Sequence, residues 1–376
     1  RDPEMSRGLG DVYKRQLEGE FDGIGVVFNM ATDTVIVLNV IPSGPSDRAG
    51  VRAGDRILRI NDSLVAGQRI PQERIVRRLR GPRGSKVRLS LGRQGIGEPV
   101  EVEVVRDVIP LRSVESAFII RDDIGFVKLS QFAQTTHREL TDALDTLRRQ
   151  GMNKLILDLR GNSGGYLDQA IRLANEFLPA GDLIVYTEDR NHEQVREYAD
   201  GTGRWQELPL AVLIDEQSAS ASEILAGALQ DNDRGTIVGR RSFGKGLVQS
   251  PRPLGYNAML KLTTAKYYIP SGRYIQAIDY SHSQEGSVKA IPDSLITEYR
   301  TRAGRKVYDG GGIMPDIRTE PEYISRFAMT LYALGFVEDF GDDYMRRHPD
   351  QRIDIRNFSI TDRDYADFAE FMKDKK

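Results

Sequence analysis

A serine cluster followed by a lysine is the part of the sequence best suited to chemistry. Residues 218–223 read Ser-Ala-Ser-Ala-Ser-Glu, and residues 242–249 read Ser-Phe-Gly-Lys-Gly-Leu-Val-Gln. A serine hydroxyl becomes a nucleophile when a neighbouring base takes its proton, and a neutral lysine amine can be that base. Because an ordinary lysine has a pKa of about 10.4, burial must lower it, and Phe243 is expected to contribute. The pair of segments predicts a serine nucleophile with Lys245 as base.

The serine cluster lies between a predicted strand and a predicted helix. Residues 208–214 are nearly all apolar, as in a strand buried on both faces, and residues 220–229 carry apolar residues at helical spacing. The serine would then stand at a helix N-terminus, where free amides point toward an oxyanion. Residues 236–238 form the next predicted strand. Glycines on both sides of Lys245 allow the loop to bring the amine back to the serine.

The same residues also have a purely structural interpretation. Ser220 and Glu223 have the spacing of a capping box, in which the serine bonds to the N3 amide and the glutamate bonds back. Most such serines only start helices, and Lys245 is by default a solvated surface residue. Periodicity does not choose among Ser218, Ser220 and Ser222 as the nucleophile.

The two segments together resemble the carboxyl-terminal processing proteases, or tail-specific proteases, which are serine-lysine peptidases with a PDZ domain. The likeness covers residues 218–231, Ser-Ala-Ser-Ala-Ser-Glu-Ile-Leu-Ala-Gly-Ala-Leu-Gln-Asp, and residues 238–249, Val-Gly-Arg-Arg-Ser-Phe-Gly-Lys-Gly-Leu-Val-Gln. It implies that Ser220 is the nucleophile, Lys245 the general base and Gln249 the residue that orients the lysine. It also implies an α/β peptidase core of the crotonase or ClpP type and catalysis through an acyl-enzyme.

A region of short predicted strands precedes this core. Residues 44–61 read Gly-Pro-Ser-Asp-Arg-Ala-Gly-Val-Arg-Ala-Gly-Asp-Arg-Ile-Leu-Arg-Ile-Asn and alternate turn residues with apolar ones. This pattern resembles a PDZ domain, which is a β-rich α+β fold. The resemblance assigns peptide binding to a carboxylate-binding loop, in which glycines free consecutive amides to converge on a carboxylate beside a strand edge. The loop residues are Gly23, Ile24, Gly25 and Val26.

The predicted PDZ helix over residues 70–80 belongs to the most basic stretch of the chain. Its apolar residues interrupt the charge too regularly for a nucleic-acid arm, so a solvated face is expected. In relatives, an arginine of the Leu-Arg-Gly segment before the closing strands couples the PDZ domain to the catalytic site. The resemblance gives this regulatory role to Arg80. The basic residues are Arg74, Arg77, Arg78, Arg80 and Arg83.

A glycine turn follows another predicted buried strand of the core. Residues 160–165 read Arg-Gly-Asn-Ser-Gly-Gly and precede a predicted helix. Such a turn either presents amides to an anion or permits close packing. By resemblance, an amide of Gly164 or Gly165 forms the oxyanion hole together with the amide of Ala221. Ser163 is a rival nucleophile by residue type, but the resemblance gives it a structural role.

These patterns divide the chain into four parts. We expect an unstructured remnant at 1–16, a PDZ domain at 17–106, the peptidase core at 107–319 and a helical extension at 320–376. In the core, predicted strands alternate with predicted helices, as in an α/β fold. The expected packed face of the extension consists of Phe327, Leu331, Leu334 and Phe336.

Composition narrows the range of functions. The chain has 376 residues, 39% of them hydrophobic, and a net charge of −2, which is typical of two or three soluble domains without a nucleic-acid or acidic-membrane partner. It has no cysteine, so disulfides, thiolate catalysis and thiolate metal sites are excluded. The four histidines lack the spacing of a metal pair or a serine triad, and no phosphate-binding or dinucleotide motif occurs. No cofactor or metal is therefore implied.

The resemblance completes the prediction of function. It implies a serine endopeptidase that recognises the free C-terminus of polypeptide substrates through its PDZ domain and hydrolyses peptide bonds. A bacterial periplasmic or cell-envelope location is expected from the family. No export signal or membrane-length apolar run is present, which predicts a truncated start. The alternative is a catalytically silent PDZ scaffold or an acyl-binding protein on the same fold. The joint presence of Ser220, Lys245 and Gln249 favours the enzyme.

Overall fold

The computed structural model describes residues 20–30, 33–93, 95–110, 112–254, 259–279, 289–290, 296–321, 323–348, 358–373 and 375. The remnant expected at residues 1–16 lies outside these residues. Within them, Pro110–Pro321 belong to one compact unit, and Asp22–Ile109 with Glu322–Lys376 belong to another. The proposed catalytic residues are all in the first unit, and the proposed peptide-binding loop is in the second.

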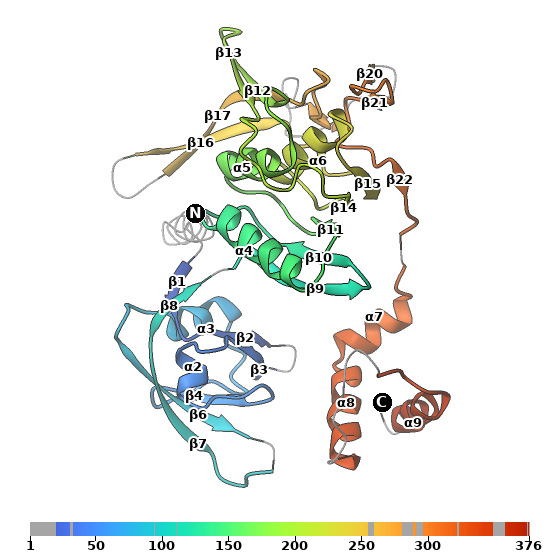
Figure 1. Ribbon diagram of the computed structural model, residues 1–376. Coiled ribbons are helices and arrows are strands. Elements are labelled where there is room, and N and C mark those ends of the chain that lie inside the picture. Colours follow the sequence, from blue (N-terminus) through green and yellow to red (C-terminus); the bar gives the residue numbers. More distant parts are fainter. Residues whose placement is uncertain are drawn as a thin grey trace. The chain divides into compact units, whose positions relative to one another are not determined.

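An antiparallel sheet with a short helix packed on it forms residues 22–109 (Figure 1). Ile75 and Leu79 lie one turn apart and form the buried face of the helix, against alternate residues of the strands such as Leu89. The predicted helix over residues 70–80 is confirmed by α3. The elements are β2 (Val26–Asn29), β3 (Val35–Val40), α2 (Pro45–Arg48), β4 (Arg56–Ile60), β5 (Ser63–Leu64), α3 (Gln72–Leu79), β6 (Lys86–Gly92) and β7 (Val100–Val105), and β1 (Glu20–Gly23) pairs with β8 (Asp107–Pro110).

A six-stranded sheet carries the chemistry-bearing segments of the other unit. Its order is β22-β15-β14-β11-β10-β9, and all neighbours are parallel except β9 and β10. Parallel strands joined by helices place the turns that follow β11 and β14 at the same edge of the sheet. The strands are β9 (Val114–Arg121), β10 (Ile124–Leu129), β11 (Lys154–Asp158), β14 (Leu210–Ile214), β15 (Thr236–Gly239) and β22 (Ile317–Arg318).

The strand before the serine cluster differs from the prediction in one respect. Burial alternates along β14, where Leu210, Val212 and Ile214 are buried but Ala211 and Leu213 are half-buried. The three buried residues belong to the core that contains side chains of the helices. The strand is therefore not buried equally on both faces, because only alternate side chains point to the helical layer.

Helices form the layer between this sheet and a second sheet (Figure 1). Helix α6 is buried along all eleven residues, as expected of a helix with neighbours on every side. The helices are α4 (Thr136–Arg149), α5 (Leu167–Phe177) and α6 (Ala221–Asp231). The second sheet is antiparallel, in the order β13-β12-β17-β16. Its strands are β12 (Leu183–Asp189), β13 (Gln194–Tyr198), β16 (Leu247–Pro253) and β17 (Met259–Tyr268), and two small pairs are β18 (Ile278–Asp279) with β19 (Lys289–Ala290) and β20 (Glu298–Arg300) with β21 (Lys306–Tyr308).

Three helices form the described part of the C-terminal extension, namely α7 (Arg326–Ala333), α8 (Phe336–Arg347) and α9 (Asp362–Lys373). The ring of Phe340 lies 5.1 Å from that of Phe368 and 5.5 Å from that of Phe371, which joins α8 to α9. The expected packed face is wrong for Phe327 and Leu334, which are 72% and 55% exposed. The aromatic contact between α8 and α9 is made by other residues, so helical periodicity predicted the wrong residues for the packed face.

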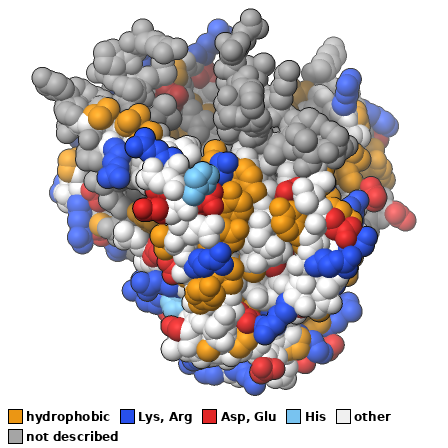
Figure 2. Space-filling view, turned by 90° about the horizontal axis from the view of Figure 1, so that it is seen from above, with side chains coloured by type: hydrophobic (Ala, Val, Ile, Leu, Met, Phe, Trp, Pro, Cys, Tyr) orange, Lys and Arg blue, Asp and Glu red, His pale blue; other side chains and the backbone are white. Residues whose placement is uncertain are grey.

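The surface seen in Figure 2 mixes side chains of both charges around a strip of hydrophobic ones. Basic residues do not form a continuous area on this face. Across the described part of the chain, no helix combines the length and the apolar character that crossing a bilayer requires.

Candidate active site

Ser220 stands at the turn between β14 and α6, as the sequence predicts. It is the N-cap of α6, and its backbone has φ 56° and ψ −115°. Non-glycine residues rarely adopt a positive φ, and strained conformations of this kind gather at functional sites. The side chain is half-buried. This setting, at the N-terminus of a helix, suits a serine whose hydroxyl meets a substrate.

The other two serines of the cluster are engaged in the core. Ser218 is fully buried, and its hydroxyl donates a hydrogen bond of 2.8 Å to the carbonyl of Leu159. Ser222 is also fully buried and donates to the carbonyl of Asn162 at 2.9 Å. Both hydroxyls therefore attach the serine turn to the segment after β11. These contacts favour Ser220 as the reacting serine, a choice that periodicity leaves open.

The glycine turn after β11 lies directly against the serine turn. A Cβ atom built on Gly164 would lie 2.9 Å from Cβ of Ser220 and 3.0 Å from the amide nitrogen of Ala221. The carbonyl of Asn162, itself fully buried, accepts a hydrogen bond of 3.0 Å from the amide of Ala219. The turns after two neighbouring parallel strands thus meet, as their position in the sheet requires.

The two glycines of this turn differ in what their amides do. The amide of Gly164 donates to Oδ1 of Asn162 at 2.9 Å, inside the core. Gly165 is exposed, with φ 151°. Ala221 is the first residue of α6, so its amide has no acceptor within the helix. The geometry therefore favours the amides of Gly165 and Ala221 over that of Gly164 as donors to an oxyanion.

Replacing Gly164 should damage both stability and activity. In Gly164→Ala the added carbon would lie 2.6 Å from the carbonyl oxygen of Ala219, on a residue with φ 99°. The matched control is Gly161→Ala, where φ is 75° but the nearest heavy atom, on Gln217, is 4.0 Å away. Positive φ costs both variants about 1–2 kcal/mol of unfolding free energy, and overpacking costs Gly164→Ala about 1–3 kcal/mol more.

Urea denaturation of both glycine variants, with the rate of peptide cleavage measured alongside, tests this expectation. Gly161→Ala should keep most of its activity, and Gly164→Ala should lose nearly all of it. Equal stabilities and equal rates would mean that the two turns are not as close as described.

Lys245 lies in the loop between β15 and β16 and is half-buried. Gln249 is half-buried on β16, in register with Thr263 of β17. The expectation that Phe243 helps to bury the lysine is wrong, because this residue is 49% exposed.

A buried carboxylate connects the serine turn to the lysine loop. Oε2 of Glu223 accepts hydrogen bonds from the amides of Ser220, at 2.8 Å, and Lys245, at 2.9 Å. Oε1 accepts from the amide of Gly244, at 2.7 Å, and from the hydroxyl of Ser242, at 2.5 Å. Burial raises the pKa of Glu223 to about 7, against the four hydrogen bonds, which lower it. The sequence marks this residue only as a helix cap.

Tyr267 on β17 is a site residue that the sequence does not single out. Its hydroxyl donates to the carbonyl oxygen of Lys245 and also lies 3.3 Å from that of Ser220. The side chain is 1% exposed, and burial raises its pKa well above the ordinary value for tyrosine. No local signal reveals these contacts, since the two acceptors are 22 and 47 positions away along the chain.

Three sequence models cover most of the chain. The model described as "Peptidase family S41" matches residues 123–282, and the model described as "PDZ domain" matches residues 23–107. A third, "Probable PDZ-protease, C-terminal helical domain", matches residues 327–376. The segment of residues 123–282 thus matches peptidase family S41. The resemblance seen in the serine and lysine segments is thereby confirmed, as is the fold class of an α/β peptidase core with an N-terminal PDZ domain.

Curated relatives carry names of the same family. The chain is 40% identical to the carboxy-terminal-processing protease of Bartonella bacilliformis, over 74% of this chain and 63% of the relative. It is 33% identical to the carboxy-terminal processing protease CtpA of Bacillus subtilis, over 72% of this chain and 57% of the relative. The chain thus spans about three fifths of the length of these two relatives. The structure of a photosystem II D1 C-terminal processing protease is 27% identical to this chain and has a TM-score of 0.45. The match covers 85% of this chain and 77% of that protease.

The loop that is expected to bind a carboxylate, residues 23–26, is anchored through its carbonyl groups. The carbonyl of Ile24 accepts from the amide of Ser46 at 2.9 Å, and that of Gly25 accepts from the amide of Ile41 at 3.0 Å. Gly25 has φ 74°, which suits glycine. The next strand, β2, is at the edge of its sheet, which is the position at which PDZ domains pair with an extended peptide.

Arg80 is the C-cap residue of α3 and is half-buried. Its amide donates to the carbonyl of Val76 at 2.9 Å, which closes the last turn of the helix. The expected solvated face is confirmed for the neighbouring arginines that are exposed, namely Arg74, Arg77, Arg78 and Arg83.

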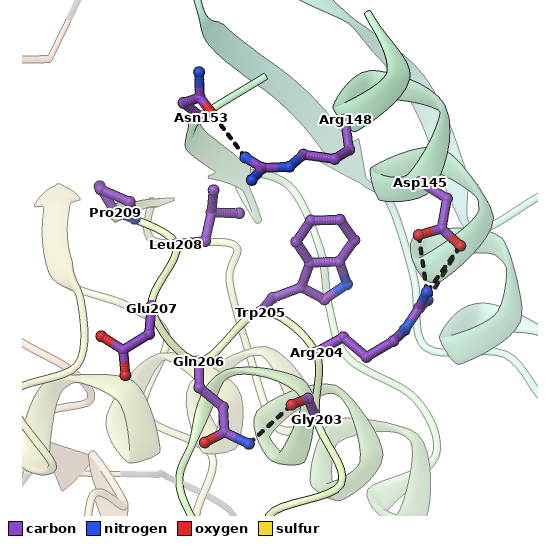
Figure 3. Close-up of a pocket in the computed structure, with 10 residues that line it drawn as sticks. All are labelled: Asp145, Arg148, Asn153, Gly203, Arg204, Trp205, Gln206, Glu207, Leu208 and Pro209. Atoms are coloured by element: carbon purple, nitrogen blue, oxygen red, sulfur yellow. Dashed lines mark hydrogen bonds and ion pairs between the residues drawn. The ribbon is translucent and has the colours of Figure 1, made fainter. Parts of the chain in front are cut away.

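A hollow of about 590 Å³ lies at another place in the core, between the end of α4 and the segment before β14 (Figure 3). Three of its charged side chains already have partners, since Arg204 binds both oxygens of Asp145 and Arg148 binds Oδ1 of Asn153. Neither Ser220 nor a residue of the lysine loop lines it, so it has no part in the candidate site. The described residues also contain no group of three or more His, Asp or Glu side chains suited to hold a metal ion.

Proposed function

We propose that this chain is a serine endopeptidase. It recognises the C-terminal tail of a polypeptide substrate through its PDZ domain and cleaves that polypeptide with Ser220 as the nucleophile. The observation that carries the proposal is the junction of the serine turn and the lysine loop. One oxygen of Glu223 accepts hydrogen bonds from the backbone amides of both Ser220 and Lys245, so the two residues belong to one site. The names of the curated relatives support a processing protease.

The proposed reaction proceeds through an acyl-enzyme. Neutral Lys245 takes the hydroxyl proton of Ser220 as its oxygen attacks the peptide carbonyl. The amides of Gly165 and Ala221 stabilise the oxyanion, and collapse of the tetrahedral intermediate breaks the C–N bond. Lys245 gives its proton to the leaving amine. A water molecule then attacks the ester carbonyl while Lys245 takes its proton. Collapse of the second tetrahedral intermediate breaks the bond to Ser220, and Lys245 returns the proton to the serine oxygen. Gln249 orients the lysine.

The other parts of the chain receive roles from the same proposal. We assign substrate recognition to residues 17–106, chemistry to residues 107–319, and a helical extension to residues 320–376. The loop of residues 23–26 would bind the free carboxylate, and Arg80 would couple this binding to cleavage. Since the two relatives come from bacteria, we propose a location in the bacterial cell envelope, close to a membrane. The silent-scaffold alternative gains no support from a site in which serine, lysine and glutamine are all retained.

Cleavage should depend on a free C-terminus in the substrate. Backbone amides bind a carboxylate more strongly than a neutral amide, because the charge strengthens each hydrogen bond. We expect an unfolded peptide with an apolar free-acid terminus to be cut about tenfold faster than its C-terminally amidated form. The measurement is the initial rate of cleavage for the matched pair, followed by mass spectrometry. Equal rates would remove tail recognition, and an absence of fragments from both would remove the endopeptidase.

A further inference from the structure

The proposed nucleophile and base are held together by two buried side chains that do not react. We propose that Glu223 and Tyr267 are positioning residues, which fix the backbone of Ser220 relative to the backbone of Lys245. This inference rests on the proposed function, since it concerns the same serine and lysine. It adds a carboxylate and a phenol to the set of residues on which the reaction depends.

The need for such residues follows from the topology. Ser220 ends the turn after β14, whereas Lys245 lies beyond β15, in the loop that leads into the other sheet. No strand ladder pairs β14 with β16. Proton transfer requires the hydroxyl and the amine within hydrogen-bonding distance, and a displacement of about 1 Å can cost about 100-fold in rate. Direct links between the two segments therefore decide whether the pair can react.

Glu223 links the two segments through their amides. Its Oε2 accepts from the amides of Ser220 and Lys245, and its Oε1 accepts from the amide of Gly244 and the hydroxyl of Ser242. The carboxylate is fully buried. A carboxylate that only capped α6 would need one amide of the serine turn and would lie in solvent. Here three of the four donors come from the lysine loop, 19 to 22 positions away.

Tyr267 links the same two residues through their carbonyl groups. Its hydroxyl contacts the carbonyl oxygens of both Ser220 and Lys245. The carboxylate thus binds the amides of both proposed catalytic residues, and the phenol, which has one proton to donate, lies against the carbonyl oxygens of both. A buried hydroxyl without an acceptor would be costly, so the phenol resists separation of the two segments.

Gln276 completes the support of the lysine loop. Its Oε1 accepts from the amide of Gly246 at 2.7 Å, and the side chain is 4% exposed. The amides of Gly244, Lys245 and Gly246 are therefore all bound by buried side-chain oxygens. Three consecutive amides are thus fixed at the position that carries the proposed base. Rigid support of this kind is what holds a reacting group in its productive geometry.

Isosteric variants of the full chain test the inference. Glu223→Gln keeps the shape but has one oxygen for two pairs of donors, so one pair loses its acceptor. Tyr267→Phe removes only the hydroxyl. Each should lower kcat about 10–100-fold, the rate equivalent of leaving one or two buried groups unpaired, while KM stays within about twofold. Glu223→Ala, which abandons all four donors, should lose more than Glu223→Gln.

Two neighbours serve as matched controls. Glu216→Gln changes an exposed glutamate that pairs with Arg240, and Tyr268→Phe changes the next tyrosine of β17, whose ring stacks on Tyr186 at 4.9 Å. Both should keep kcat within about twofold. Circular dichroism melting shows in each case whether the variant is folded.

The outcomes separate this inference from the proposed function. If the wild type cleaves and Ser220→Ala does not, but folded Glu223→Gln and Tyr267→Phe both retain wild-type kcat, the positioning role is overturned and the peptidase stands. A rise in KM with unchanged kcat would also overturn it, because the residues would then act on binding. If the wild type itself fails to cleave, the proposed function is overturned, and the positioning inference loses its basis.

Discussion

Ser220→Ala should abolish peptide-bond hydrolysis, lowering kcat by about 10⁴-fold or more, because no other group can form the acyl-enzyme. The other serines of the cluster cannot replace it, since the hydroxyls of Ser218 and Ser222 are buried and bonded to carbonyl groups. The measurement is cleavage of a fluorescent reporter peptide under single-turnover conditions. Loss of an N-cap costs about 0.5–2 kcal/mol, so melting curves must show that the variant is folded.

The matched control for the nucleophile is Ser163→Ala. Ser163 is exposed on the glycine turn, close in sequence to the proposed oxyanion amide of Gly165. It should retain wild-type kcat. A folded Ser220→Ala that cleaves at the normal rate would show that another residue attacks, and loss of activity in Ser163→Ala alone would name that residue.

The local structure around the nucleophile was accessible from the sequence. An apolar run, a serine cluster and a helical period predict a strand, a turn and a helix, and the structure has β14, Ser220 and α6 in that order. Such elements depend on neighbours in sequence, which is why periodicity finds them. The helix of the PDZ domain was found in the same way. Recognition of the family supplied the roles of the residues, which spacing alone did not.

The contacts that complete the site were not accessible in this way. Asn162 holds the amide of Gly164, and Tyr267 contacts the carbonyl groups of Ser220 and Lys245. Each of these contacts except the first joins segments more than twenty positions apart. A sequence pattern cannot report them, since they follow from how the sheets and helices pack. The choice between the two glycine amides likewise needed the position of the Asn162 side chain.

Exposure was also misjudged where tertiary contacts decide it. Phe243 adjoins the catalytic loop and is apolar, which favoured a role in burying the lysine, but it is 49% exposed. Phe327 has the spacing of a packed face and is 72% exposed. Hydrophobic character raises the average burial of a residue type without fixing the burial of one residue.

Glu223 lowers the stability of the folded chain at high pH. Its pKa of about 7 exceeds the ordinary value of 4.5, so between these values the folded state binds a proton that the unfolded state does not. The free energy of unfolding therefore falls as the pH rises through this window. Well above pH 7 the buried charge costs about 3 kcal/mol. A helix cap alone does not require that cost, which agrees with the proposed positioning role of this carboxylate.

Lys245→Arg should be as inactive as Lys245→Ala, with kcat lowered by about 10³-fold or more, even though it keeps a long basic side chain. A guanidinium stays protonated at all accessible pH values and cannot take the proton of Ser220. The same substitution at Lys266, an exposed lysine whose ammonium lies 5.3 Å from the ring of Tyr274, should leave kcat unchanged.

The pH dependence of these two arginine variants distinguishes a base from a structural cation. The wild type and Lys266→Arg should gain activity as the pH rises, because the fraction of neutral amine at Lys245 grows. The residual rate of Lys245→Arg should not follow that rise. Steady-state rates on one reporter peptide from pH 6 to pH 10 measure both effects in the same experiment. Normal turnover by Lys245→Arg would show that the lysine contributes only its charge, and the base would then have to be sought among the other groups that face Ser220.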